Sequence, residues 1–387
     1  MRPIARTTVL VLGVILALDL AAGLTLRELM PSWNLRYYDN THRIRSEVFH
    51  HGLTPGREVL DVWGRRGYRL AINSLGFKDR SARHVPADGG LPRLVVIGDS
   101  FTEGVGFPFE ETFAGHLSSA LESKGVEVLN AGVISFAPSL YYRRLRDVIV
   151  EKGMRIDEVV VFLDISDIFE EAVSYKEDAN GRLIVPAKRD RTLRTARHWY
   201  RDHSLIARTF YVARDARRLS KRRNSVRKTT AAVLGRDPDS LTDTEMQLYH
   251  SITLPGSRLA HDPSAWKEYG DRGRAKAARQ MSLLAAMLRE RNIPLTVVVY
   301  PWPAHLLLDP EGNGHVDFWG RWAADNGAGF IDLFPVFTAT EAADVLERYF
   351  IDFDVHWNAD GHRLVAESFL ERYCGAPSCR DTFNGRE

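Results

Sequence analysis

The chain has 387 residues, of which 44% are hydrophobic and 26% charged, and its formal net charge is +2. These values are typical of a folded protein and leave room for one large α/β domain with additions or for two modest domains. The near-neutral balance indicates no class of partner by itself, so any basic surface must be local.

The N-terminus carries an apolar segment. Residues 8–26 are apolar except for threonines and Asp19, and Arg2 and Arg6 precede them. The length matches one membrane-spanning helix, and the positive-inside rule places the rest of the chain outside the cytoplasm. We therefore expect residues 1–27 to be a single-pass signal anchor in the inner (cytoplasmic) membrane, with a periplasmic domain. A cleaved signal peptide is the alternative, because small residues follow Asp19.

Residues 28–90 contain short alternating pieces, which predict strands or extended segments packed on a core. From residue 91 to residue 373, apolar runs alternate with helical patterns, which predicts a mainly parallel, helix-covered sheet. The fold class is therefore α/β, a flavodoxin-like three-layer α/β/α sandwich. Its five expected strands lie at 94–97, 126–130, 158–167, 295–301 and 329–334.

A strongly basic segment interrupts this alternation between about residues 170 and 272. Residues 188–228 contain 15 lysines and arginines against three aspartates, with aromatic and aliphatic residues between them. This pattern predicts an amphipathic helical insertion whose basic face meets anionic lipid or an acidic polysaccharide. A solvated helix face is the alternative, and nucleic acid is not an expected partner of an exported domain.

The two cysteines, Cys374 and Cys379, lie in the C-terminal tail, residues 374–387. In an oxidising compartment this spacing predicts a small disulfide loop. Two cysteines without a nearby histidine make a poor zinc site, and no metal or other cofactor is expected.

The first strand of the domain ends in Gly98-Asp99-Ser100 and is followed by a helical pattern. A glycine permits a strained turn, and the carboxyl edge of a parallel sheet is where ligands bind. Ser100 is therefore a candidate nucleophile, and a helix cap is the alternative.

A serine nucleophile needs a base, and the base needs a carboxylate that fixes its tautomer. Asp354 and His356 lie two residues apart shortly before the last helix, at an expected strand-to-helix junction. In a parallel sheet this loop and Ser100 open at the same edge, so we predict a triad of Ser100, His356 and Asp354.

Four segments together resemble the blocks of the SGNH hydrolases, also called the GDSL family. They are GDSFTEG near residue 100, NAG at 130–132, DISD at 164–167 and DVHWNADGH at 354–362. The resemblance covers roughly residues 91–373 without the basic insertion. In much of the family the carboxylate lies three residues before the histidine, where this chain has Phe353. Asp354 at two residues before resembles the periplasmic polysaccharide acetyltransferases of the superfamily, and Asp352 is a weaker candidate.

The resemblance also implies an oxyanion hole made by Ser100, Gly132 and a third-block residue. The family has an asparagine at that third position, where this chain has Ser166. Ser166 either replaces the missing donor or caps a turn. Trp302 and Trp357 are candidate walls of a substrate site, with core packing as their alternative role.

The resulting expectation is an exported, membrane-anchored serine esterase that removes or transfers O-acyl groups on envelope or extracellular glycans. A lipid substrate stays open. The alternative is a non-catalytic SGNH-fold protein that binds polysaccharide or lipid in an envelope assembly complex. The missing asparagine favours the binding protein, and the serine, histidine and aspartate favour the enzyme.

Overall fold

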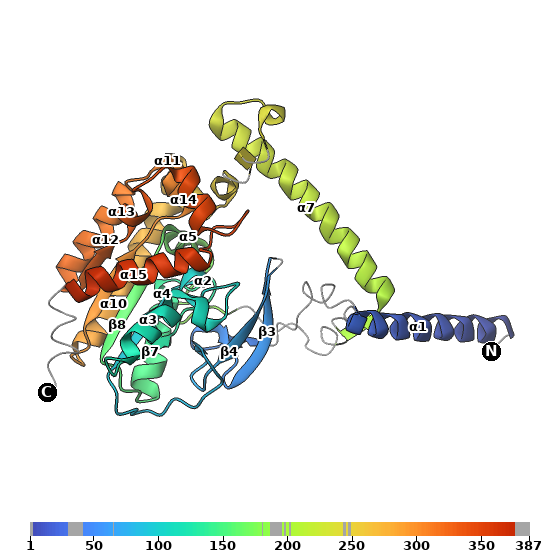
Figure 1. The fold of residues 1–387 in the computed structure, drawn as a ribbon, viewed down its shortest axis with the longest axis horizontal. Helices are drawn as coiled ribbons and strands as arrows, with labels where there is room; N and C mark the ends of the chain where they lie inside the picture. The colour runs from blue at the N-terminus through green and yellow to red at the C-terminus, as the bar shows by residue number, and fades with distance from the viewer. Residues whose placement is uncertain are drawn as a thin grey trace.

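The computed structural model describes residues 3–29, 42–64, 66–179, 181–185, 196, 199–200, 203–242, 245–246 and 249–375 (Figure 1). Its centre is an eight-stranded sheet in the order β10-β9-β8-β6-β7-β5-β4-β3. Five neighbouring strands are parallel, and each lies at one of the five positions predicted from the sequence. They are β6 (Arg93–Ile97), β7 (Glu127–Asn130), β8 (Glu158–Leu163), β9 (Leu295–Val299) and β10 (Gly329–Asp332).

The expectation of a five-stranded sheet is wrong, because the segment before residue 90 extends the same sheet. β5 (Lys78–Asp79) pairs antiparallel with β7, and β4 (Arg66–Ile72) and β3 (Arg57–Trp63) continue the sheet antiparallel beyond it. These strands are rich in charged residues, so their pattern does not resemble that of a buried parallel strand. A separate hairpin, β1 (Arg43–Ser46) and β2 (His50–Leu53), precedes them.

Each central strand packs on both faces, as a parallel sheet requires. Successive residues of β6 enter opposite cores: Leu94 and Val96 pack in one apolar cluster, and Val95 and Ile97 in the other. On the first face lie α3 (Phe113–Glu122), α11 (Pro303–Leu308), α13 (Phe334–Phe337), α14 (Ala342–Tyr349) and α15 (Ala359–Gly375). The second face is covered by α4 (Pro138–Arg146), α10 (Asp271–Arg289) and α12 (Asn313–Asn326).

Short helical turns complete the domain. α2 (Ser100–Glu103) and α5 (Ile165–Val173) follow β6 and β8 directly, so the predicted third strand ends before DISD, which begins a helix. The remaining turns are 3₁₀ at Phe109–Glu111, Pro238–Ser240, His250–Thr253 and Gly256–Ala260, π at Asp147–Glu151 and Trp266–Gly270, and α9 at Pro263–Ala265.

Two long helices leave this body. α1 (Pro3–Leu29) contains a stretch, Arg6–Leu26, that is long and apolar enough to cross a membrane. α7 (Leu205–Leu234) occupies the basic insertion and runs from the body to α1 (Figure 1). Cys379 lies outside the described residues, so its disulfide with Cys374 stays a prediction.

Candidate active site

The turn after β6 is shaped by its glycine and its aspartate. A Cβ at Gly98 would lie 2.2 Å from the Thr102 hydroxyl oxygen and 3.0 Å from the Phe162 carbonyl oxygen, so only glycine fits. The Asp99 carboxylate caps α2 by accepting the backbone N–H of Phe101 at 2.9 Å. Asp99, and not Ser100, is therefore the cap, and Ser100 is placed in the first turn of the helix, at the carboxyl edge of the sheet.

Ser100, His356 and Asp354 form one continuous chain of hydrogen bonds. The Ser100 hydroxyl lies 2.7 Å from His356 Nε2, and His356 Nδ1 is hydrogen-bonded to Asp354 Oδ1. Ser100 and His356 are buried, each with 7% of its surface exposed. An ionised Asp354 fixes the proton on Nδ1 and leaves the Nε2 lone pair for the serine proton. The structure thus brings together the three residues predicted as a triad, in the order that nucleophilic catalysis requires.

The loop that carries the histidine differs from the predicted strand-to-helix junction. It follows helix α14 and is closed by an antiparallel bridge between Phe350 and Trp357. Phe353 in this loop has φ 54°, a left-handed conformation that is costly for a side chain of this size. Asp354 and His356 follow this turn. Although Asp354 is only two positions before His356, its carboxylate reaches the histidine ring. Asp352 is exposed, and the hydrogen bonds described for His356 do not involve it.

Both carboxylate oxygens of Asp354 accept hydrogen bonds. Its Oδ1 accepts the backbone N–H groups of Val355 and His356, and its Oδ2 accepts the indole N–H of Trp63 at 2.9 Å. Burial disfavours the charged carboxylate, but the hydrogen bonds and charge of His356 outweigh burial, and the pKa of Asp354 is lowered. Asp354 therefore stays ionised at neutral pH and can stabilise a protonated His356.

Trp63 is the site residue that sequence reasoning missed. It ends β3, in the antiparallel edge of the sheet, 291 positions before Asp354 in the chain. Its ring also packs edge-on against His356, with centroids 4.9 Å apart. No local motif marks it; the only available signal is a tryptophan within residues 28–90, where short strands or extended segments were expected.

A buried cluster of carboxyl groups lies beneath the serine. Tyr300 donates to Asp164 at 3.0 Å and contacts Asp99 at 3.3 Å, while Tyr141 donates to Asp167 at 2.6 Å. Burial, and then the charge of Asp164, raise the pKa values of Asp99 and Asp167 well above the ordinary range. The raised pKa disfavours a negative charge on Asp99 beside Ser100, where an oxyanion would form.

Two of the three expected oxyanion donors, Gly132 and Ser166, are engaged with protein acceptors. The Gly132 N–H donates to the Asn130 side chain at 3.0 Å, and the Ser166 hydroxyl donates to Asp164 at 2.7 Å. A Cβ at Gly132 would lie 2.6 Å from the Glu103 backbone nitrogen, so glycine is required there by its close approach to α2. Ser166 itself lies in the first turn of α5, which Asp164 caps.

The two candidate wall residues are mainly packed inside the domain. Trp357 has no exposed surface and packs against Phe101 and Tyr300, so in this structure it has no face to offer a substrate. Trp302 is 7% exposed, and its indole N–H donates to Asp164 at 2.7 Å. Both tryptophans support the site from the core, which was the alternative role.

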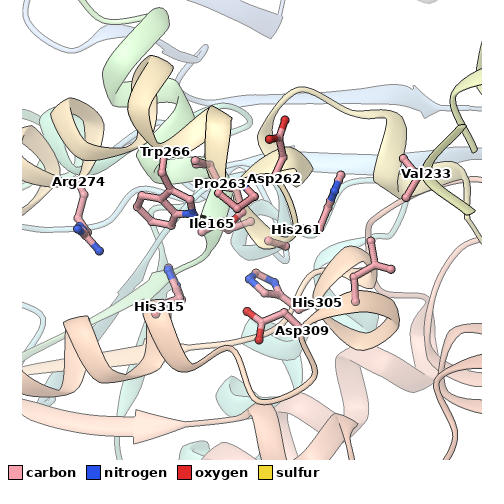
Figure 2. A pocket seen from close by; sticks show the side chains of 14 residues that line it. Ile165, Val233, His261, Asp262, Pro263, Trp266, Arg274, His305, Asp309 and His315 are labelled. Carbon is pink, nitrogen blue, oxygen red and sulfur yellow. Dashed lines mark hydrogen bonds between the residues drawn. The ribbon is translucent and has the colours of Figure 1, made fainter.

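A cavity of about 630 Å³ opens at the same sheet edge, beyond the ends of β8 and β9 (Figure 2). Its wall includes Ile165, which follows Asp164, together with Trp266, Arg274, His305 and His315. Burial lowers the pKa of His305 to about 3 and that of His315 to about 4, so both rings are neutral. Within the described residues, no group of three His, Cys, Asp or Glu side chains is arranged to hold a metal ion.

No protein-family model and no curated protein matches this sequence. Among solved structures, the chain is similar to TesA (11% identity, TM-score 0.39), covering 72% of this chain and 96% of that one. A second is described as a putative lipolytic protein of the G-D-S-L family from Desulfitobacterium hafniense DCB-2 (12%, TM-score 0.39, covering 72% and 98%). A third is a catalytic mutant of Axe2, an acetylxylan esterase from Geobacillus stearothermophilus (12%, TM-score 0.37, covering 72% and 93%). Because these likenesses are remote, the function proposed for this chain rests on its own side chains.

Proposed function

We propose that the protein is a serine esterase of the SGNH type, with Ser100 as nucleophile, His356 as general base and Asp354 as the residue that orients the base. The observation that carries this proposal is the unbroken hydrogen-bond chain from Ser100 through His356 to an ionised Asp354. A histidine paired in this way on both ring nitrogens is the arrangement that activates a serine hydroxyl.

The reaction has two steps. The Ser100 oxygen attacks the ester carbonyl while His356 Nε2 takes the serine proton and then delivers it to the leaving alcohol. A water molecule next loses a proton to His356 and attacks the acyl-enzyme carbonyl. The bond between the acyl group and the Ser100 oxygen breaks, His356 returns the proton to that oxygen, and the acid is released. If a sugar hydroxyl replaces that water, the same residues transfer the acyl group.

The oxyanion donors set the expected rate. The backbone N–H of Ser100 lies in the first turn of α2, where amides have no partner within the helix. Gly132 must release Asn130, and Ser166 must release Asp164, before either can donate to the intermediate. One missing donor costs about 2.7–4 kcal/mol in acyl transfer. We therefore expect slow turnover of simple esters and faster turnover of a substrate that reorganises this edge.

For the substrate we propose an O-acylated glycan of the envelope or extracellular space. The apolar residues 8–26 of α1 and the two arginines before them support a location at the inner membrane with the active site outside the cytoplasm. The cavity beside α5 supports a carrier larger than the acyl group, because it offers an aromatic ring, an arginine and neutral histidines.

The first test is hydrolysis of p-nitrophenyl acetate by the full-length chain in detergent, beside Ser100→Ala. We expect the variant to lose at least about 10³-fold in rate. A fluorophosphonate probe should label the unmodified chain only, at Ser100. Equal slow hydrolysis by both chains, together with an unlabelled Ser100, would contradict the proposal.

The second candidate function is a glycan- or lipid-binding protein that no longer turns over esters. The observation that favours it is that both Gly132 and Ser166 donate to protein acceptors. It is distinguished by the same probe, because a serine that binds without reacting gives no covalent label.

A further inference from the structure

Asp19, an acidic residue inside the apolar stretch of α1, is covered by α7. Only 7% of Asp19 is exposed, and its Oδ1 accepts the backbone N–H of Ile206 at 2.8 Å. Ile206 lies in the first turn of α7, where backbone amides lack helical partners and the helix dipole favours a negative charge. A carboxylate that is costly in lipid is thus placed at a helix end that needs an acceptor.

The two helices also touch through a glycine. A Cβ at Gly23 would lie 2.0 Å from the His203 carbonyl oxygen, so the approach exists only because residue 23 has no side chain. Gly23 lies one turn after Asp19, on the same face of α1. Gly13 of the same helix makes no such close approach, because a Cβ there would meet nothing within 4 Å.

Apolar and aromatic side chains near this contact are exposed over much of their surface. We call them the α7 foot: Trp199, Tyr200, Ile206 and Phe210, which are 53%, 39%, 60% and 65% exposed. Large side chains of this kind gathered beside a lipid-facing helix fit the boundary of a bilayer, where tryptophan and tyrosine are enriched. Water is an unfavourable surrounding for all four.

Exposed cations begin farther along α7. Arg217, Arg218 and Lys221 are exposed. Arg217 is 11 residues beyond Ile206, or about 16 Å along the helix axis. Asp19 lies seven residues, or about 10 Å, inside the outer end of the apolar stretch at Leu26. α7 runs obliquely away from α1 toward the body (Figure 1), so these exposed cations lie farther from α1 than the Asp19–Ile206 contact does.

We propose that α1 is retained in the mature protein and that the α7 foot is inserted beside it in the outer leaflet of the membrane. The Asp19–Ile206 and Gly23–His203 contacts join the two helices, and the cations of α7 face anionic headgroups. The body is then held at a fixed distance from the membrane by a 30-residue helix and not by a flexible tether. A cleaved signal peptide would leave the α7 foot without its partner.

The test uses the full chain, with Cys374→Ser and Cys379→Ser, in vesicles of phosphatidylethanolamine and phosphatidylglycerol. An environment-sensitive fluorophore is attached at Phe210→Cys or, as the matched control, at the exposed Ser225→Cys on the same helix. We expect lipids with a shallow spin label to quench position 210 several-fold more than position 225. Iodide in the water should show the reverse order. Equal iodide quenching at both positions would overturn the proposal.

Two further variants separate the contact from general effects on α1. Gly23→Leu should expose position 210 to iodide as fully as position 225, whereas Gly13→Leu should leave the quenching unchanged. Equal behaviour of the two variants would contradict the contact. The mass of the mature chain from bacterial membranes should include residues 3–29, and a chain that begins after Ala21 or Ala22 would overturn the retention of α1.

Discussion

The two halves of the central sheet are held together by different physics. The parallel half, β6 to β10, is built from apolar runs such as Val159–Leu163, buried on both faces. The antiparallel edge, β3 to β5, shares this apolar core through Leu70 and Ile72 of β4 and is tied to the body by buried charges as well. Arg43 bridges Asp61 of β3 and Glu103 of α2, and Lys78 of β5 donates to two backbone carbonyls in the loop after α2.

This difference matters for the site, because each half supplies part of it. The parallel half positions Ser100, and the antiparallel edge supplies Trp63, which holds Asp354. Hydrophobic burial is non-directional, whereas hydrogen bonds and ion pairs fix orientation. We infer that the charged edge serves to orient the triad, and the predictions below test that division.

The largest expected effect on stability comes from Arg43→Ala. Glu103 is fully buried, and removal of the arginine leaves its carboxylate without its partner. The expected loss is about 3–5 kcal/mol in the free energy of unfolding, measured by urea denaturation in detergent. The matched control is Arg69→Ala, which breaks an exposed pair with Glu58 and should cost less than about 1 kcal/mol. Equal losses in the two variants would show that the buried pair stabilises the fold no more than the exposed pair does.

The next effect concerns catalysis and comes from Trp63→Phe. The variant keeps a ring against His356 but removes the N–H that Asp354 accepts. A hydrogen bond to a charged group contributes about 1.5–3 kcal/mol, so we expect kcat to fall at least about tenfold. Because Trp63 acts through Asp354, the acid limb of the pH–rate profile should also move, whereas KM should change little. A rise in KM with unchanged kcat would instead assign Trp63 to substrate binding.

A third prediction is the acid sensitivity of the charged edge. Burial opposes the charge of Asp61, but its hydrogen bond from His42 and the charge of Arg43 outweigh burial and lower its pKa. A lowered folded-state pKa gives stability that is present above the unfolded value near 4 and is lost as pH falls below it. We expect Asp61→Asn to remove about 2 kcal/mol of the decrease in unfolding free energy between pH 5 and pH 2. Glu58→Gln, on the same strand but exposed, should keep the wild-type slope.

The smallest expected effect belongs to the parallel half. Burial and the charge of Asp164 raise the pKa of Asp99, which favours its neutral form, and Asp99→Asn supplies a neutral side chain of nearly the same shape. We expect activity within about threefold of wild type, while Asp99→Ala removes the cap of α2 and costs about 1 kcal/mol in stability. A loss in Asp99→Asn as large as in Ser100→Ala would show that Asp99 acts as a charged group.

The sequence alone determined the parts of this protein that depend on local pattern. Five parallel strands follow from apolar runs between turn residues, and the helical insertion follows from its charge and aromatic spacing. Ser100, Asp354 and His356 follow from the turns and short motifs that carry them. These features are readable because burial on both faces of a strand, or on one side of a helix, imposes a period on neighbouring residues.

Only the tertiary structure decided the contacts between distant segments. The extension of the sheet to eight strands, the bond from Trp63 to Asp354 and the cover of Asp19 by Ile206 join residues far apart in the chain. The structure also decided that Gly132 and Ser166 donate inside the protein and that Trp357 belongs to the core. A polar side chain is satisfied by whichever partner the fold brings within about 3 Å, and no local period in the sequence records that choice.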